Sequence, residues 1–270
     1  MEFKDILVHI DNSKQCPGRV VLAIRLAKKH RAHLTGLYAV THPYYAPQNA
    51  ALEHNVEQLK ESFLANTAEA DIQAEFICAD WAVTGESIVS ILNSYAHQKD
   101  LIIISQADQK QVQEHLPGDL PERIVLGSGR PVLVIPYVGT FDTVGERVLV
   151  AWKAGRASSR AVHDAMPFLN KAEQVIVVSV TSPADQPVPD TGLNAEIHTH
   201  LKRHHINVRV ENLASGEVPV DSVLMNYAWE HGCDLLVMGV YAQSQRGSLS
   251  VGPVTKDFFK RMTVPILMSH

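Results

Sequence analysis

Short apolar segments alternate with segments of helical periodicity along the whole chain. Leu101–Ile104 and Leu235–Met238 are apolar at every position, as expected for strands of a parallel sheet that helices cover on both faces. The alternation predicts an α/β fold built from open, doubly wound sheets. We expect strands at residues 5–10, 33–40, 72–79, 100–105, 131–135, 147–152, 174–180, 206–213, 234–239 and 264–269. We expect helices at residues 17–31, 49–70, 85–98, 119–129, 157–170, 193–204, 217–231 and 253–262.

The sequence also repeats itself, which is the strongest indication of domain organisation. Asp100–Ser105 matches Asp234–Gly239, and Gly118 matches Gly252, so both pairs are 134 residues apart. The first strands of the two copies match at a slightly larger spacing. We therefore predict two domains that diverged from one ancestor. The predicted domains are residues 1–138 and residues 146–270, with a linker between them.

The charge balance narrows the classes of partner. The chain has 24 Lys and Arg against 29 Asp and Glu, a net charge of −5, and its basic residues are scattered. Because neutralising phosphates along a strand needs a concentrated basic face, we expect no nucleic-acid binding. Three widely spaced cysteines without a CxxC pair argue for a reducing compartment. Because we see no signal peptide and no membrane-length apolar run, we expect a cytoplasmic protein with no membrane partner.

A candidate ligand-binding loop follows the fourth strand of the second copy. It reads Gly239-Val240-Tyr241-Ala242, then nine residues, then Gly252-Pro253-Val254-Thr255. Gly239 allows the backbone to approach a ligand closely or to adopt a positive φ angle. Pro253 suits the first position of a helix, where its missing N–H costs nothing. The free N–H groups and the dipole of that helix then favour a bound phosphate.

This loop resembles the one in the universal stress protein family. That family has Gly, two residues, Gly, nine residues, Gly and then Ser or Thr at the same junction of strand, loop and helix. The resemblance spans both copies and implies Rossmann-like domains of the adenine nucleotide alpha hydrolase-like type, each with a five-stranded parallel sheet flanked by helices. It also implies ATP, accompanied by Mg²⁺, as the ligand, with its phosphates and ribose held by the loop.

The resemblance assigns the site residues of the second copy. They are Lys153, Val180, Gly239, Ala242, Gly252, Pro253, Val254 and Thr255. Three positions depart from the family pattern: Ala242 replaces the second glycine, Pro253 replaces the Ser or Thr, and Lys153 stands where the family often has an Asp. Val180 corresponds to a position beside the base. Lys153 lies near the base or, as a cation, in contact with phosphate.

The first copy matches the family's site less well. Of the loop glycines only Gly118 remains, and Asp11 matches the Asp that the family often has after its first strand. Acidic residues, among them Asp108, Glu114, Asp119 and Glu122, stand where phosphates would lie, and like charges at close range disfavour binding. Asp119 and Glu122, three residues apart, also fit a helix capping box, which is a structural use of the same acids. We therefore expect this copy to bind nucleotide poorly and to serve as a structural partner.

The family resemblance also implies pairing of domains through their last strands. Residues 131–135 and 265–269 would pair within one chain as an internal pseudo-dimer, which removes one edge from each sheet. Association of the pseudo-dimer into a homodimer stays open at this point.

We expect a stress-response protein that binds ATP or another adenine nucleotide in its C-terminal domain, where occupancy sets conformation or the choice of protein partner. No catalytic residues are assigned, because the chain has no GxSxG elbow and no P-loop, and any ATP hydrolysis would be slow. Two alternatives remain: an interaction protein whose sites have both decayed, or a protein that binds another small metabolite in the cleft of the fold.

Histidines on one predicted helix raise the question of a metal site. His200 and His204 are four residues apart on one face, and His198 and His205 lie beside them. Two ligands on a helix can begin a zinc site. Because no third ligand is evident, a solvated helix face is the simpler interpretation, and we assign no metal.

Overall fold

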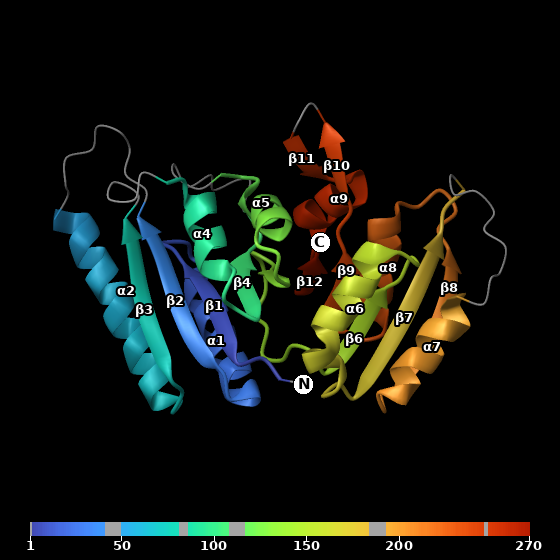
Figure 1. Ribbon diagram of the computed structural model, residues 1–270, viewed down its shortest axis with the longest axis horizontal. Helices are drawn as coiled ribbons and strands as arrows, with labels where there is room; N and C mark the ends of the chain where they lie inside the picture. The colour runs from blue at the N-terminus through green and yellow to red at the C-terminus, as the bar shows by residue number, and fades with distance from the viewer. Residues whose placement is uncertain (1, 41–49, 81–85, 108–116, 184–192, 246–247) are drawn as a thin grey trace. The chain divides into compact units, whose positions relative to one another are not determined.

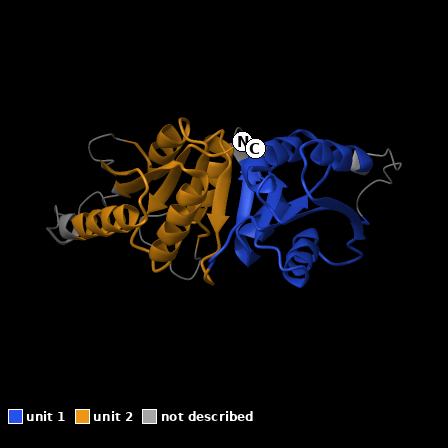
Figure 2. Ribbon diagram, turned by 90° about the horizontal axis from the view of Figure 1, so that it is seen from below, with its two compact units in different colours: residues 1, 141–270 blue, residues 2–140 orange. Residues whose placement is uncertain are grey.

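The computed structural model describes residues 2–40, 50–80, 86–107, 117–183, 193–245 and 248–270. The chain forms two compact units, residues 2–140 and residues 141–270, which are coloured separately in Figure 2. Each unit is an α/β domain with a parallel sheet flanked by helices, as the sequence predicts.

The N-terminal domain follows the predicted order of elements closely. Its strands are β1 (Asp5–Ile10), β2 (His33–Val40), β3 (Ala74–Asp80), β4 (Leu101–Ser105) and β5 (Val132–Ile135). Its helices are α1 (Cys16–His30), α2 (Ala50–Glu69), α4 (Ile88–Ala96) and α5 (Leu120–Gly127). The strands pair in parallel in the order β3-β2-β1-β4-β5.

The C-terminal domain has the same architecture. Its main strands are β6 (Arg147–Ala151), β7 (Gln174–Thr181), β8 (Val208–Ala214), β9 (Leu235–Gly239) and β12 (Ile266–Ser269). Its helices are α6 (Arg156–Leu169), α7 (Leu193–Arg203), α8 (Val220–Glu230) and α9 (Pro253–Arg261). The strands pair in parallel in the order β8-β7-β6-β9-β12. The shared order supports an origin by duplication.

The cores of both sheets consist of the continuous apolar strands. Leu101–Ile104 and Leu235–Met238 are buried, as required for strands that helices cover on both faces. In the C-terminal domain, right-handed crossovers place α6 and α7 on one face and α8 and α9 on the other (Figure 1). The strand order reverses between β6 and β9, so the crevice beyond their carboxyl ends is where a ligand is expected.

One element was not predicted. The loop after β9 forms an antiparallel hairpin of β10 (Ala242–Gln245) and β11 (Ser248–Val251), which projects beyond the sheet in Figure 1. The Gly252 N–H extends this pairing by donating to the Tyr241 carbonyl oxygen at 3.2 Å. The nine residues between the two parts of the motif are therefore largely an ordered ribbon.

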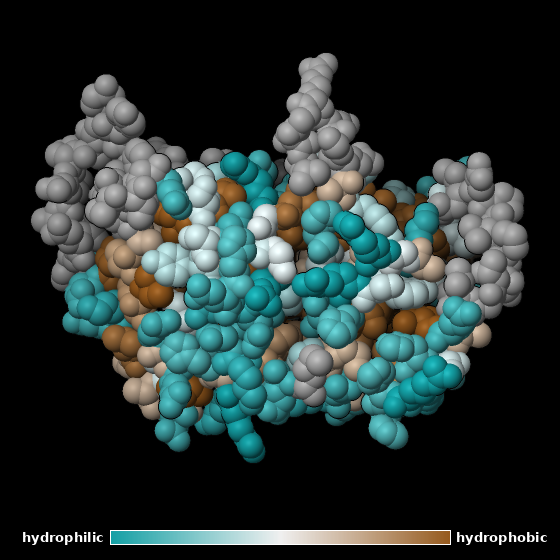
Figure 3. Space-filling view, in the orientation of Figure 1, coloured by the Kyte–Doolittle hydropathy of each residue, from teal (hydrophilic) through white to brown (hydrophobic). Residues whose placement is uncertain are grey.

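The described surface is mixed in character. The face in Figure 3 shows mostly hydrophilic residues with small hydrophobic patches between them. Among the described helices, none combines the length and the apolar character that crossing a bilayer requires.

Candidate functional site

A cavity of about 380 Å³ lies at the carboxyl ends of the central strands of the C-terminal domain. Residues of β6, β7 and β9 form one side, and residues of α8 and α9 form the other. Its lining residues are Ala151, Trp152, Lys153, Ser158, Val178, Val180, Ser182, Val220, Leu224, Met238, Gly239, Tyr241, Val254, Thr255 and Phe258. The lining is mainly apolar with a few polar groups, which is typical of small-molecule sites.

Five of the eight predicted residues line this cavity. They are Lys153, Val180, Gly239, Val254 and Thr255, and they come from four separate segments of the chain. Lys153 is the one charged residue among the described residues of the lining. A ligand with an anionic group would therefore meet one positive charge in a mainly apolar cavity.

The other three predicted residues lie outside the lining. Ala242 borders a neighbouring pocket of about 400 Å³ that Arg156 and Arg160 also line. Gly252 and Pro253 begin α9 but do not border the 380 Å³ cavity. The Gly252 amide is already bonded within the hairpin, so it is not available to a ligand in this conformation.

The first turn of α9 gives the cavity a second source of positive potential. Gly252 is the N-cap residue and has no side chain to cap the helix. Val254 and Thr255, at the second and third helical positions, both line the cavity. Because the first N–H groups of a helix have no intrahelical partner, those of these two residues are suited to an anion, and the helix dipole acts in the same direction.

Gly239 owes its identity to packing. A Cβ atom at this position would lie 2.3 Å from the Ala157 carbonyl carbon and 2.5 Å from the Ser158 nitrogen. Its φ angle is not positive, so the conformational freedom of glycine is not what β9 requires here. The glycine allows the start of α6 to pack directly against the end of β9.

In the N-terminal domain, the corresponding Asp11 is bound by the protein's own groups. Arg19, which is fully buried, places Nη2 3.0 Å from Asp11 Oδ2. The Arg19 Nε donates to the His9 carbonyl oxygen at 2.7 Å, and Nη1 donates to Ser105 Oγ. Asp11 Oδ1 accepts hydrogen bonds from the backbone and hydroxyl of Ser13. Asp11 is therefore a structural residue in this conformation.

This buried cluster shifts two pKa values. Burial would raise the pKa of Asp11, but the Arg19 guanidinium, His9 and the two bonds from Ser13 outweigh it and hold the pKa at about 2. Burial lowers the pKa of His9 to about 4, with Arg19 acting in the same direction and Asp11 against it. At neutral pH the cluster is a carboxylate–guanidinium pair beside a neutral imidazole.

Gly118, the other predicted residue of the first copy, precedes α5. A Cβ atom at this position would meet no heavy atom within 4 Å. Nothing in its packing therefore requires a glycine. Asp108 and Glu114 lie outside the described residues. Asp119 is the N-cap residue of α5, but its side chain makes no capping hydrogen bond, so the predicted capping box is not formed.

The sequence did not identify several residues of both sites. Trp152, Ser158 and Ser182 line the cavity, and only the adjacency of Trp152 to a strand end could have suggested it. The buried position of Arg19, in contrast, could have been predicted from the sequence. Arg19 lies four residues before Ala23, on the buried face of α1. An arginine on such a face predicts a buried partner.

Comparison with known proteins places this geometry in a family. The chain matches the universal stress protein family over residues 2–136 and again over residues 145–270. A universal stress protein of Synechocystis sp. is 25% identical over 177 residues. That match covers 62% of this chain and 57% of the relative, so it spans little more than half of the relative's length.

Solved structures show the same fold. A universal stress protein from Archaeoglobus fulgidus DSM 4304 superposes with a TM-score of 0.75 at 16% identity, covering 98% of this chain and 95% of that one. A putative universal stress protein from Pseudomonas aeruginosa UCBPP-PA14 has a TM-score of 0.62 at 16% identity, covering 99% and 93%. Because the two family matches include both domains, the chain belongs to the universal stress protein family, as a tandem member with two copies of the family's domain.

Proposed function

We propose that the C-terminal domain binds an adenine nucleotide in the 380 Å³ cavity and that the N-terminal domain does not. The observation that carries the proposal is the meeting of three features in one place: an apolar cavity at the switch point of the sheet, the uncapped start of α9, and Lys153. The apolar side suits a base, and the positive end suits a phosphate.

The chain's own residues have distinct roles in this proposal. Val178, Val180 and Leu224 offer an apolar surface for the base, and Ser158 and Ser182 offer hydroxyls to the ribose. The amides of Val254 and Thr255, together with Lys153, receive the phosphates. Mg²⁺ would enter with ATP and reduce the charge that the protein must balance.

The N-terminal domain has a different role. Arg19 supplies to Asp11 the positive charge that balances its carboxylate, so this domain keeps its stability without a ligand.

We propose that occupancy of the C-terminal site, in a stress response, controls the choice of protein partner. Any hydrolysis of ATP would be slow, because no general base is placed in the described lining.

Calorimetric titration of the whole chain with ATP, AMP and unrelated metabolites tests the proposal, and one position makes the test sharp. The substitution Gly252→Asp caps α9, because Asp is a favoured N-cap residue, and it adds a negative charge beside the proposed phosphate site. It should therefore leave folding intact and weaken nucleotide binding at least about tenfold, or about 1.4 kcal/mol.

Two matched variants separate charge from other effects. Gly252→Asn caps the helix without the charge, so it should bind nucleotide more tightly than Gly252→Asp. Gly118→Asp introduces the same charge in the N-terminal domain, into open space, and should leave binding unchanged. Equal affinity in all chains, or heat from an unrelated metabolite alone, would remove the basis of the proposal.

A further inference from the structure

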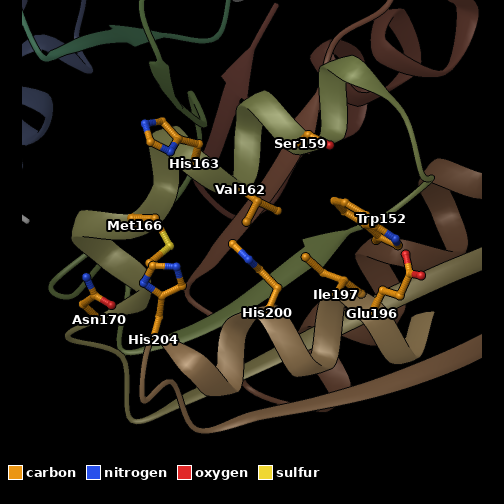
Figure 4. A pocket seen from close by; sticks show the side chains of 10 residues that line it. All are labelled: Trp152, Ser159, Val162, His163, Met166, Asn170, Glu196, Ile197, His200 and His204. Carbon is orange, nitrogen blue, oxygen red and sulfur yellow. The ribbon is translucent and has the colours of Figure 1, made fainter. Parts of the chain in front are cut away.

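A second cavity, of about 630 Å³, lies on the other face of the same sheet, between α6 and α7. Figure 4 shows the ten side chains that line it. They are Trp152, Ser159, Val162, His163, Met166, Asn170, Glu196, Ile197, His200 and His204. Val162, Met166 and Ile197 are buried and form an apolar floor, whereas the histidines lie on the exposed rim.

Two of these histidines are four residues apart: His200 lies in the last turn of α7, and His204 is the first residue after it. Their rings are in contact, with centroids 4.9 Å apart and planes inclined at 65°. Among the described residues, neither side chain makes a hydrogen bond or an ion pair. Within the described ranges, the two imidazoles are therefore not held by other groups.

The separation of the two ring centroids is compatible with a shared metal ion. A nitrogen bound to a divalent transition metal lies about 2.0–2.1 Å from it, which puts each ring centroid about 3.2 Å from the ion. Two such rings would be about 4.5 Å apart at a right angle and about 5.2 Å apart at a tetrahedral angle. The observed 4.9 Å lies between these values.

The residues around the two histidines add negative charge and leave coordination positions of a bound ion open. Glu196 lies one turn before His200 on the same side of α7 and lines the same cavity, as Figure 4 shows. His163 reaches the rim from α6. Among the described residues, no three His, Cys, Asp or Glu side chains are placed to share one ion. Two histidines would therefore hold the ion, and water or a small ligand would fill its other positions.

We propose that His200 and His204 form a binding site for a divalent transition-metal ion of the zinc, nickel and copper class at the rim of the α6–α7 cavity. Imidazole suits these ions, and two imidazoles four residues apart at the end of a helix lie close enough to bind one ion.

Isothermal titration of the whole chain with Zn²⁺ at pH 7.5 tests the site. The variant His200→Gln/His204→Gln should lose at least about tenfold in affinity for one equivalent of Zn²⁺. The matched control is His198→Gln/His205→Gln, which removes two histidines of the same region that do not line the cavity and should keep the affinity. Far-UV circular dichroism verifies that both variants fold.

A further result has a fixed meaning. With Cu²⁺ as the probe, the electron paramagnetic resonance spectrum should show two coupled nitrogens, and the first double variant should lose them. Equal losses in the two double variants, unchanged binding in the first, or no binding tighter than about 0.1 mM would overturn the proposal.

Discussion

The buried imidazole of His9 should make the stability of the N-terminal domain depend on pH. His9 is 2% exposed, and its pKa is lowered to about 4, whereas a histidine in an unfolded chain titrates near its ordinary value of 6.5. Between pH 4 and pH 6.5, His9 is therefore mostly protonated in the unfolded chain and mostly neutral in the folded chain. Lowering the pH through this range therefore favours unfolding. The stability that the neutral His9 side chain contributes is fully present only above about pH 6.5.

The magnitude follows from the two pKa values. Each unit of difference corresponds to about 1.4 kcal/mol, so the full contribution of a shift from 6.5 to about 4 is about 3 kcal/mol. Between pH 7.5 and 4.5, linkage gives a loss of about 2.5 kcal/mol from this group alone. This loss is a large part of the free energy of unfolding of an ordinary domain, which is about 5–15 kcal/mol.

The substitution His9→Gln removes the titration and keeps a polar side chain. We expect urea unfolding, followed by circular dichroism at several pH values, to show that the unaltered chain loses about 2.5 kcal/mol more than the variant over this range. Asp11, with a pKa of about 2, titrates below the range and adds little to the difference. Stability curves that run parallel within about 0.5 kcal/mol would refute the reasoning.

Other variants probe the packing of both domains. Arg19→Met leaves the buried Asp11 carboxylate without its partner and should cost about 3–5 kcal/mol in urea unfolding, whereas an unchanged midpoint would contradict the buried pair. Gly239→Ala should cost about 1–3 kcal/mol, because its methyl group meets backbone, while Gly118→Ala, in open space, should change thermal stability by less than about 0.5 kcal/mol. At pH 8 a thiol reagent should label Cys78 alone in the native chain and all three cysteines in denaturant, because the other two are buried and their thiol pKa values are raised.

Much of the fold could be predicted because it depends on local pattern. The continuous apolar runs of β4 and β9 and the repeated spacing of the two copies fixed the type of sheet and the number of copies. The β10–β11 hairpin was missed because β10 has no apolar alternation, β11 alternates over only four residues, and the two strands pair only with each other. Where cross-strand bonds form between weakly patterned segments, the sequence carries little signal.

The candidate site was predictable only in part, for a physical reason. Lys153 follows β6, Val180 lies near the end of β7, and Thr255 lies in the first turn of α9, and the topology of a doubly wound sheet brings such positions together. The packing role of Gly239 depends instead on how closely α6 approaches β9, and that distance is a property of the assembled core. A glycine in the sequence does not reveal which neighbour requires it.

The arginine inside the N-terminal domain changes what an aspartate after a first strand means. Arg19 meets the charge of Asp11 on one oxygen, and Ser13 donates to the other, so both carboxylate oxygens are engaged within the fold. An aspartate at the family's position can therefore be a structural residue, and the side chain that the following helix buries against it decides which of the two roles it has.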